Sequence, residues 1–104
     1  MQIKTSLNLD GQNPYILIKV GWCEPFIKIY PYVQPNEYRK AGTQMAIVGQ
    51  PSSYGEMLAM QSMCHKAASI VRVCEEQLKE DDNLTTLIEH LVTVFEIGQY
   101  WTGL

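Results

Sequence analysis

The side chains best suited to chemistry in this chain are three cysteines and two histidines, at Cys23, Cys64, His65, Cys74 and His90. A cysteine thiolate activated by a histidine is a common catalytic nucleophile, so the adjacent Cys64 and His65 suggest thiol catalysis. Neighbours in a helix point about 100° apart, however, and adjacency alone creates no hydrogen bond. We therefore favour a core position for Cys64 and a solvated His65. Cys23 falls in a turn that can expose it, with no basic neighbour to lower its pKa.

Patterns for metal binding and for acid–base catalysis are missing from the sequence. No C-x-x-C or H-x-x-x-H spacing occurs, so we expect no zinc site. The carboxylate pairs Glu75–Glu76 and Asp81–Asp82 fall at a helix end and in a connector, where both members are solvated. No Gly-x-Ser-x-Gly motif and no glycine-rich phosphate loop occurs. We therefore expect a protein that is not an enzyme, with no catalytic residue, no metal and no cofactor.

Aromatic and basic residues gather in the first half of the chain. The set that we expect to form a binding surface is Trp22, Lys28, Tyr30, Tyr32, Tyr38, Arg39 and Lys40. Aromatic rings stack on bases and cations meet phosphates, so a site for a small nucleotide-like ligand is one interpretation. A protein interface is the second, because Tyr, Trp and Arg anchor such interfaces, and plain strand surface is the third. The sequence leaves all three open.

The first half of the chain predicts a small antiparallel sheet. Residues 2–9 alternate apolar and polar, as a half-buried strand does, and residues 15–20 are apolar on both faces, as an inner strand is. Residues 26–33 form a third strand, on which Lys28, Tyr30 and Tyr32 share one face; residues 43–48 form a short fourth. Pro31 cannot donate a ladder hydrogen bond, so we expect the third strand to be an edge there or to end there.

The second half predicts two helices. In residues 53–79 apolar or small residues recur at alternating steps of three and four, which keeps one side of a helix dry. Ser53 followed by Glu56 fits a capping box, and Asp82 or Asn83 caps a second helix that ends at Gly98 or runs on to Trp101. The fold class is α+β: a three- to four-stranded antiparallel β-sheet followed by a C-terminal αα-hairpin. Residues 1–104 form a single domain, with residues 1–50 as the sheet half and residues 53–101 as the hairpin.

The length of the first helix predicts a homo-oligomer. Residues 53–79 span about 40 Å as a helix, whereas a compact domain of this size is only about 30 Å across. The helix should overhang its own globule, and a second copy would cover its apolar stripe. The residues expected at this interface are Met57, Met60, Met63, Cys64, Ala67, Val71, Cys74 and Leu78.

Charge and composition limit the partners. The chain carries −3 at neutral pH: residues 1–53 contribute +2 and residues 54–104 contribute −5. An acidic helical half argues against duplex nucleic acid, whereas the mildly basic first half suits a small anion. No run approaches the ~18 apolar residues of a membrane span, and residues 1–4 lack a signal-peptide layout. We expect no membrane association, a cytoplasmic location and reduced cysteines.

In architecture alone, this plan resembles small phage-encoded counter-defence proteins, some of which sequester nucleotide signals between subunits. The resemblance implies a homo-oligomeric binding protein that holds a small anionic, nucleotide-derived ligand at a subunit interface. The alternative is a recognition or inhibitor module that binds one larger protein through its aromatic-basic sheet face. A thiol-dependent enzyme is the third hypothesis, and it predicts one cysteine that reacts fast at neutral pH.

Overall fold

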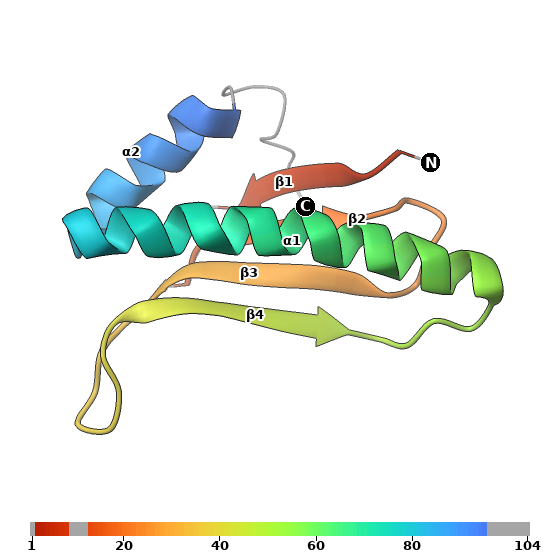
Figure 1. Cartoon of the computed structure of the whole chain (residues 1–104), viewed down its shortest axis with the longest axis horizontal. Coiled ribbons are helices and arrows are strands. Elements are labelled where there is room, and N and C mark those ends of the chain that lie inside the picture. The colour runs from red at the N-terminus through yellow and green to blue at the C-terminus, as the bar shows by residue number, and fades with distance from the viewer. Residues whose placement is uncertain (1, 9–12, 96–104) are drawn as a thin grey trace.

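The computed structural model describes residues 2–8 and 13–95 of the 104-residue chain. In chain order these residues form the strands β1 (Lys4–Asn8), β2 (Tyr15–Lys19), β3 (Phe26–Val33) and β4 (Gly42–Val48), followed by the helices α1 (Tyr54–Glu80) and α2 (Leu84–Phe95). Figure 1 shows the sheet half and the two helices. The predicted α+β fold, an antiparallel sheet followed by a helical hairpin, is confirmed, and the sheet has its fourth strand.

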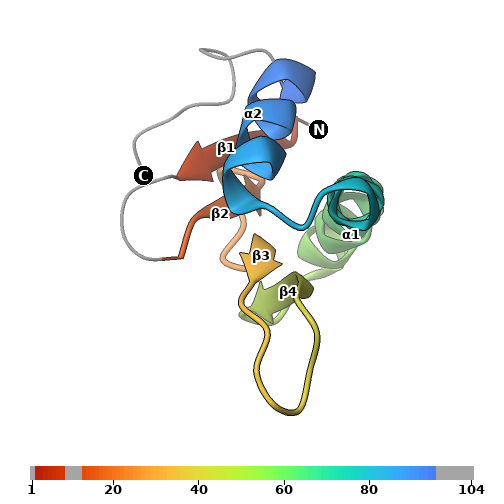
Figure 2. The same cartoon turned by 90° about the vertical axis from the view of Figure 1, so that its left-hand side faces the viewer.

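The sheet is antiparallel throughout, in the order β1-β2-β3-β4, so β1 and β4 are its outer strands. Leu7 lies opposite Ile16, and Ile18 lies opposite Ile27, which aligns the apolar residues of three strands on one face. Both helices lie on this face of the sheet (Figure 2). The core that they enclose contains Leu7, Ile16, Ile18, Val20, Cys23, Ile27, Ile29, Ala59, Met63, Ala67, Ile70, Cys74, Leu87 and Leu91.

A β-bulge interrupts the pairing of β3 with β4 around Pro31. Tyr30 lies opposite Gln44 and Val33 lies opposite Gly42, so three steps along β3 match two along β4. The extra residue lets the strand continue to Val33 although Pro31 has no N–H to donate. Of the two expectations for Pro31, an end of the strand is wrong, because β3 continues to Val33. An edge at this position is confirmed, because β2 pairs with β3 only at residues 27–29 and Pro31 has β4 alone beside it.

The bulge also moves Tyr32 to the other face of the sheet. Tyr32 packs against the buried core, on the side of the helices, whereas Tyr30 meets the Tyr15 ring on the opposite face. The prediction that Lys28, Tyr30 and Tyr32 share one face is therefore wrong for Tyr32. Strict alternation holds only up to the extra residue, and beyond it the in-and-out order is reversed.

The helix α1 starts at the predicted N-cap, Ser53, and is continuous over Tyr54–Glu80. Only one bond of the predicted capping box is present, because the Glu56 carboxylate bonds the Ser52 hydroxyl and not the Ser53 backbone N–H. The Ser53 hydroxyl oxygen accepts a hydrogen bond from the Glu56 backbone N–H at 3.1 Å, and the Ser52 hydroxyl donates to the Glu56 carboxylate at 2.9 Å. The 27 residues of α1 span about 40 Å, and the longest dimension of the molecule is 40 Å. We expected α1 to overhang a compact globule. It lies along the sheet instead, and the molecule is elongated in the direction of the helix (Figure 1).

Replacing Ser53 by alanine is expected to lower the free energy of unfolding by about 1 kcal/mol, because the Glu56 N–H at the first turn loses its acceptor. Urea denaturation followed by circular dichroism measures this change. The matched control is Ser69→Ala, at an exposed position within the same helix, where alanine is neutral or slightly stabilising. Equal effects of the two substitutions would show that the cap contributes nothing.

The buried stripe of α1 differs from the predicted one. It consists of Glu56, Ala59, Met63, Ala67, Ile70 and Cys74. Three residues assigned to the oligomer interface, Met63, Ala67 and Cys74, therefore pack inside a single copy of the chain and offer no surface to a second one. For these three the prediction is wrong, because the chain's own sheet covers them.

The other predicted interface residues lie along one flank of α1. They are Met57, Met60, Cys64, Val71 and Leu78. Each follows a buried residue by one or four positions, and the right-handed turn of about 100° per residue directs them to the side of α1 where β4 lies (Figure 1). They are half-buried or exposed, so their place in an oligomer interface stays a prediction.

The second helix completes the hairpin. The Asn83 side-chain oxygen accepts a hydrogen bond from the Thr86 backbone N–H at 3.2 Å, so of the two predicted caps it is Asn83 that serves. Leu87 and Leu91, one turn apart, are buried in the core. The predicted ends at Gly98 or Trp101, and the last residue of the predicted first strand, lie outside the described residues. Within the described part of the chain, no helix has the length and apolarity needed to cross a bilayer.

Candidate functional site

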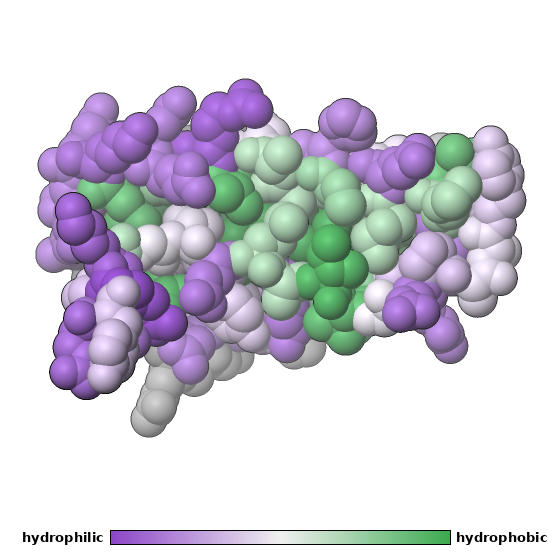
Figure 3. All heavy atoms as spheres, turned by 60° about the horizontal axis from the view of Figure 1, so that its bottom comes forward, coloured by the Kyte–Doolittle hydropathy of each residue, from purple (hydrophilic) through white to green (hydrophobic). Residues whose placement is uncertain are grey.

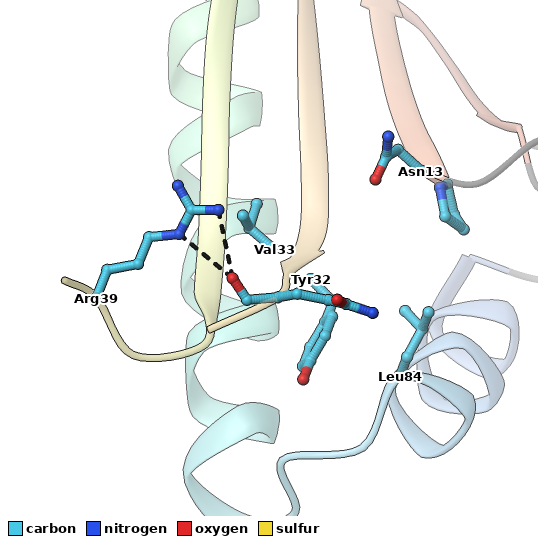
Figure 4. A pocket seen from close by; sticks show the side chains of 7 residues that line it. Asn13, Tyr32, Val33, Arg39 and Leu84 are labelled. Atoms are coloured by element: carbon cyan, nitrogen blue, oxygen red, sulfur yellow. Dashed lines mark hydrogen bonds between the residues drawn. The ribbon is translucent and has the colours of Figure 1, made fainter. Parts of the chain in front are cut away.

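Two adjoining hollows lie at the end of the sheet where β3 leads into the loop before β4. The first, which we call the Tyr32 hollow, has a volume of about 480 Å³ and is lined by Asn13, Pro14, Tyr32, Val33, Gln34, Arg39 and Leu84 (Figure 4). The second, the Tyr30 hollow, has a volume of about 320 Å³ and is lined by Asn13, Tyr15, Tyr30, Val33 and Gln44. Two lining residues, Asn13 and Val33, are common to both, so the hollows are neighbours.

Arg39 is held at the rim of the Tyr32 hollow by an ordered loop. The Asn36 side-chain oxygen accepts hydrogen bonds from the backbone N–H groups of Tyr38 at 2.8 Å and of Arg39 at 2.9 Å. The backbone N–H of Asn36 donates to the Arg39 carbonyl at 3.0 Å. The Arg39 guanidinium in turn donates from Nε and Nη2 to the Gln34 carbonyl, each at 3.3 Å (Figure 4). These bonds position a permanent positive charge at the hollow and leave further N–H groups of the guanidinium for a ligand.

Two aromatic rings line the Tyr30 hollow, and a second cation contacts one of them. The Tyr15 and Tyr30 rings meet edge to face, with centroids 6.1 Å apart and planes at 62°. The Lys28 ammonium nitrogen lies 4.5 Å from the centre of the Tyr15 ring, within cation–π distance. The Asn8 side-chain amide donates to the Tyr15 hydroxyl at 3.0 Å. These contacts hold two rings and an ammonium group together beside the hollow.

Three of the seven predicted binding residues line these hollows: Tyr30, Tyr32 and Arg39. A fourth, Lys28, lines neither hollow but contacts the Tyr15 ring, which lines the second. Trp22 lies away from both, because it precedes β3 while the hollows lie at its other end. Eight strand residues separate the two ends by about 26 Å. Trp22 lies beside Gly55 at the start of α1 and is 59% exposed.

Tyr38 and Lys40, the remaining two predicted residues, belong to the loop but not to the hollow walls. Both are exposed, and Tyr38 at 88% is the most exposed large hydrophobic residue among those that the structure describes. Although both residues adjoin Arg39 in the chain, neither lines the hollows.

The sequence does not predict four of the residues that line the hollows, namely Asn13, Tyr15, Gln34 and Gln44. A signal for one of them was present: in an antiparallel pair the start of one strand lies beside the end of the next, so the start of β2 brings Tyr15 to the end of β3. The three amides fall in a turn, in a loop and on β4, and no motif marks them.

The cysteines show none of the features of a nucleophile site. Cys23 is buried, not exposed as its turn position allowed, and burial raises the pKa of its thiol, with a further increase from the Glu56 carboxylate. Burial also raises the pKa of Cys74 to about 12. The core position predicted for Cys64 is wrong, because this side chain is only half-buried. His65 is exposed, as predicted. Among the described residues, no three His, Cys, Asp or Glu side chains form a group able to hold a metal ion.

Comparisons with protein-family models, with curated proteins and with solved structures find no match for this chain. The residues of the site therefore carry the functional argument alone.

Proposed function

We propose that this protein binds a small anionic, nucleotide-derived ligand in the Tyr32 and Tyr30 hollows and does not transform it. The observation that carries the proposal is the convergence of Arg39 and Tyr32 on one hollow with Lys28, Tyr15 and Tyr30 beside the next. Volumes of about 480 and 320 Å³ fall within the usual range of small-molecule pockets, roughly 300–1,000 Å³.

The chemistry of the lining residues fits such a ligand. A guanidinium binds phosphate oxygens through parallel N–H groups, and phenol rings stack on a nucleobase or meet it edge-on. The amides of Asn13, Gln34 and Gln44 offer both donors and acceptors to the edge of a base or to a ribose. None of the described residues that line the two hollows is acidic, so none of these side chains repels an anion.

Titration calorimetry with cyclic dinucleotides and with ADP-ribose tests the proposal. Binding by at least one of them is expected, and Arg39→Ala should weaken it about tenfold to a hundredfold, because a charge-assisted hydrogen bond contributes ~1.5–3 kcal/mol. Tyr30→Ala should also weaken binding. The matched control is Lys40→Ala, which removes the same charge from the next residue, outside the hollow.

Two results would contradict the proposal. One is the absence of binding by every nucleotide tested. The other is an equal loss of affinity in Arg39→Ala and Lys40→Ala, which would indicate a diffuse charge effect and not a site.

The second candidate function is recognition of one larger protein. The observation that favours it is Tyr38, which projects from the tip of an ordered loop with 88% of its surface exposed. Tyrosine in such a position is a common interface anchor. A pull-down from lysate that recovers one stoichiometric protein, and loses it with Tyr38→Ala, would favour this function over ligand capture. A pull-down that stays empty would argue against it.

A further inference from the structure

The two outer strands of the sheet differ in how well they resist pairing with another chain. β1 has five residues and carries Lys4, a charge of the kind that protects sheet edges. β4 has seven residues, Gly42–Val48, and contains no charged residue and no proline. An outer strand of this length and composition offers its free N–H and C=O groups to a further strand.

Apolar side chains surround this open edge. Met45 and Ile47 lie opposite Ile29 and Ile27, hence on the helix-covered face of the sheet, yet they are 46% and 52% exposed. The flank of α1 formed by Met57, Met60 and Cys64 faces the side on which β4 lies, and α1 packs against β4. We call these five residues the β4 strip.

Figure 3 shows the molecule from the β4 side, with hydrophobic residues gathered across the middle of this view. The α1 part of the strip also borders a hollow of about 590 Å³, shared with Gln61, His65 and Ala68. A contiguous apolar area along an unpaired strand is typical of an interaction surface.

We propose that the β4 strip binds a second copy of this chain, with the two β4 strands paired antiparallel about a two-fold axis to give one continuous sheet. A strand paired antiparallel with its own copy is self-complementary, as a two-fold interface requires. Each Met45 and Ile47 would then pack against its counterparts across the seam, and the two α1 flanks would cover them.

Charge also favours a second copy at this edge. The chain carries −3 overall and −5 in residues 54–104, and two copies that meet along β4 bring no like charges into direct contact, because β4 contains no charged residue. The ends of the strand bear opposite signs: Lys40 precedes its start, and Glu24 lies close to its end, two residues before Phe26, which is opposite Val48. Antiparallel pairing brings the start of one β4 beside the end of the other, so unlike charges approach.

Light scattering after size-exclusion chromatography at micromolar concentration tests the interface. The expected mass is about 24 kDa, twice the 11.9 kDa of one chain. Ile47→Lys should shift it to 11.9 kDa with the circular dichroism spectrum unchanged, because this side chain is half exposed in one copy and each lysine would put a charge into the apolar seam. The matched control is Leu58→Lys, also at an exposed apolar position but about 100° round α1 from Met57, which should leave the dimer intact.

Hydrogen exchange of the wild-type protein provides a readout that needs no variant. Protection of the β4 amides should rise with protein concentration, whereas protection of β1 should not change. A wild-type mass of 11.9 kDa would overturn the proposal, as would a dimer that withstands Ile47→Lys or that protects β1 instead. None of these measurements involves a nucleotide, so the dimer and the ligand site succeed or fail separately.

Discussion

Replacing Met63 by alanine is expected to lower the free energy of unfolding by about 2–5 kcal/mol, the range for truncating a large buried side chain. Met63 is 0% exposed and lies in the middle of the buried stripe of α1. The residues four positions before and after it on that stripe are Ala59 and Ala67. These alanines let the helix approach the sheet closely, and Met63 is the one large side chain between them. Neither alanine can fill a cavity at residue 63, which favours the upper part of the range.

Urea denaturation monitored by circular dichroism measures the loss. The midpoint should fall while the slope of free energy against urea stays constant, because the surface exposed on unfolding is nearly the same. The control is Leu58→Ala, five positions earlier on α1 and 40% exposed, which should cost well under half as much. If Met63→Ala were no more costly than Leu58→Ala, the packing of this face of α1 on the sheet would be refuted.

The same stripe shows how far hydrophobic periodicity determines structure. The sequence contains two overlapping apolar patterns on α1, one through Met57, Met60 and Cys64 and one through Ala59 and Met63. They differ by one position, or about 100° around the helix, and both have the three-and-four spacing. Hydropathy favours the first pattern because methionine is more apolar than alanine. Packing selects the second, because a flat sheet surface of isoleucines admits a helix closely only where its side chains are small.

The binding residues illustrate a different limit. Alternation along β3 correctly separates Lys28 and Tyr30 from the buried Ile27 and Ile29. It fails at Tyr32, because the bulge arises from the pairing of β3 with β4 and from Pro31, and pairing is a property of two strands that one strand's pattern does not contain. Composition alone grouped Trp22 with Arg39, although the length of β3 separates them. The sequence shows which residue types are available to a site, whereas which of these residues meet depends on the tertiary pairing.

The second large effect that we expect is a difference in thiol reactivity. In the folded Ile47→Lys variant, in which no second copy is expected to cover the β4 strip, Cys64 should react with iodoacetamide at pH 8 far faster than Cys74. Burial raises the pKa of Cys74 from its usual 9.0 to about 12, with a smaller contribution from the Glu75 carboxylate. At pH 8, each unit by which the pKa is raised lowers the thiolate fraction about tenfold, so an increase of three units lowers it about a thousandfold. The labelling rate falls with it, because the thiolate is the form that reacts. Because the shift is upward, the thiol of Cys74 stays protonated as the pH rises past 9, and its labelling rate should stay far below that of Cys64 until the pH nears 12.

Trypsin separates the three thiols of the Ile47→Lys variant, since cleavage after lysine and arginine leaves Cys23 in residues 20–28, Cys64 in residues 48–66 and Cys74 in residues 73–79. Mass spectrometry of these peptides over time gives each rate, and labelling in concentrated urea, where all three should react alike, is the control. Rapid labelling of Cys74 in the folded protein would mean that α1 opens locally, since a thiol with no exposed surface reacts only through opening. Rapid labelling of Cys23 alone, faster than a free thiol at neutral pH, would instead revive the thiol-dependent enzyme, because neither burial nor the nearby Glu56 carboxylate favours its thiolate.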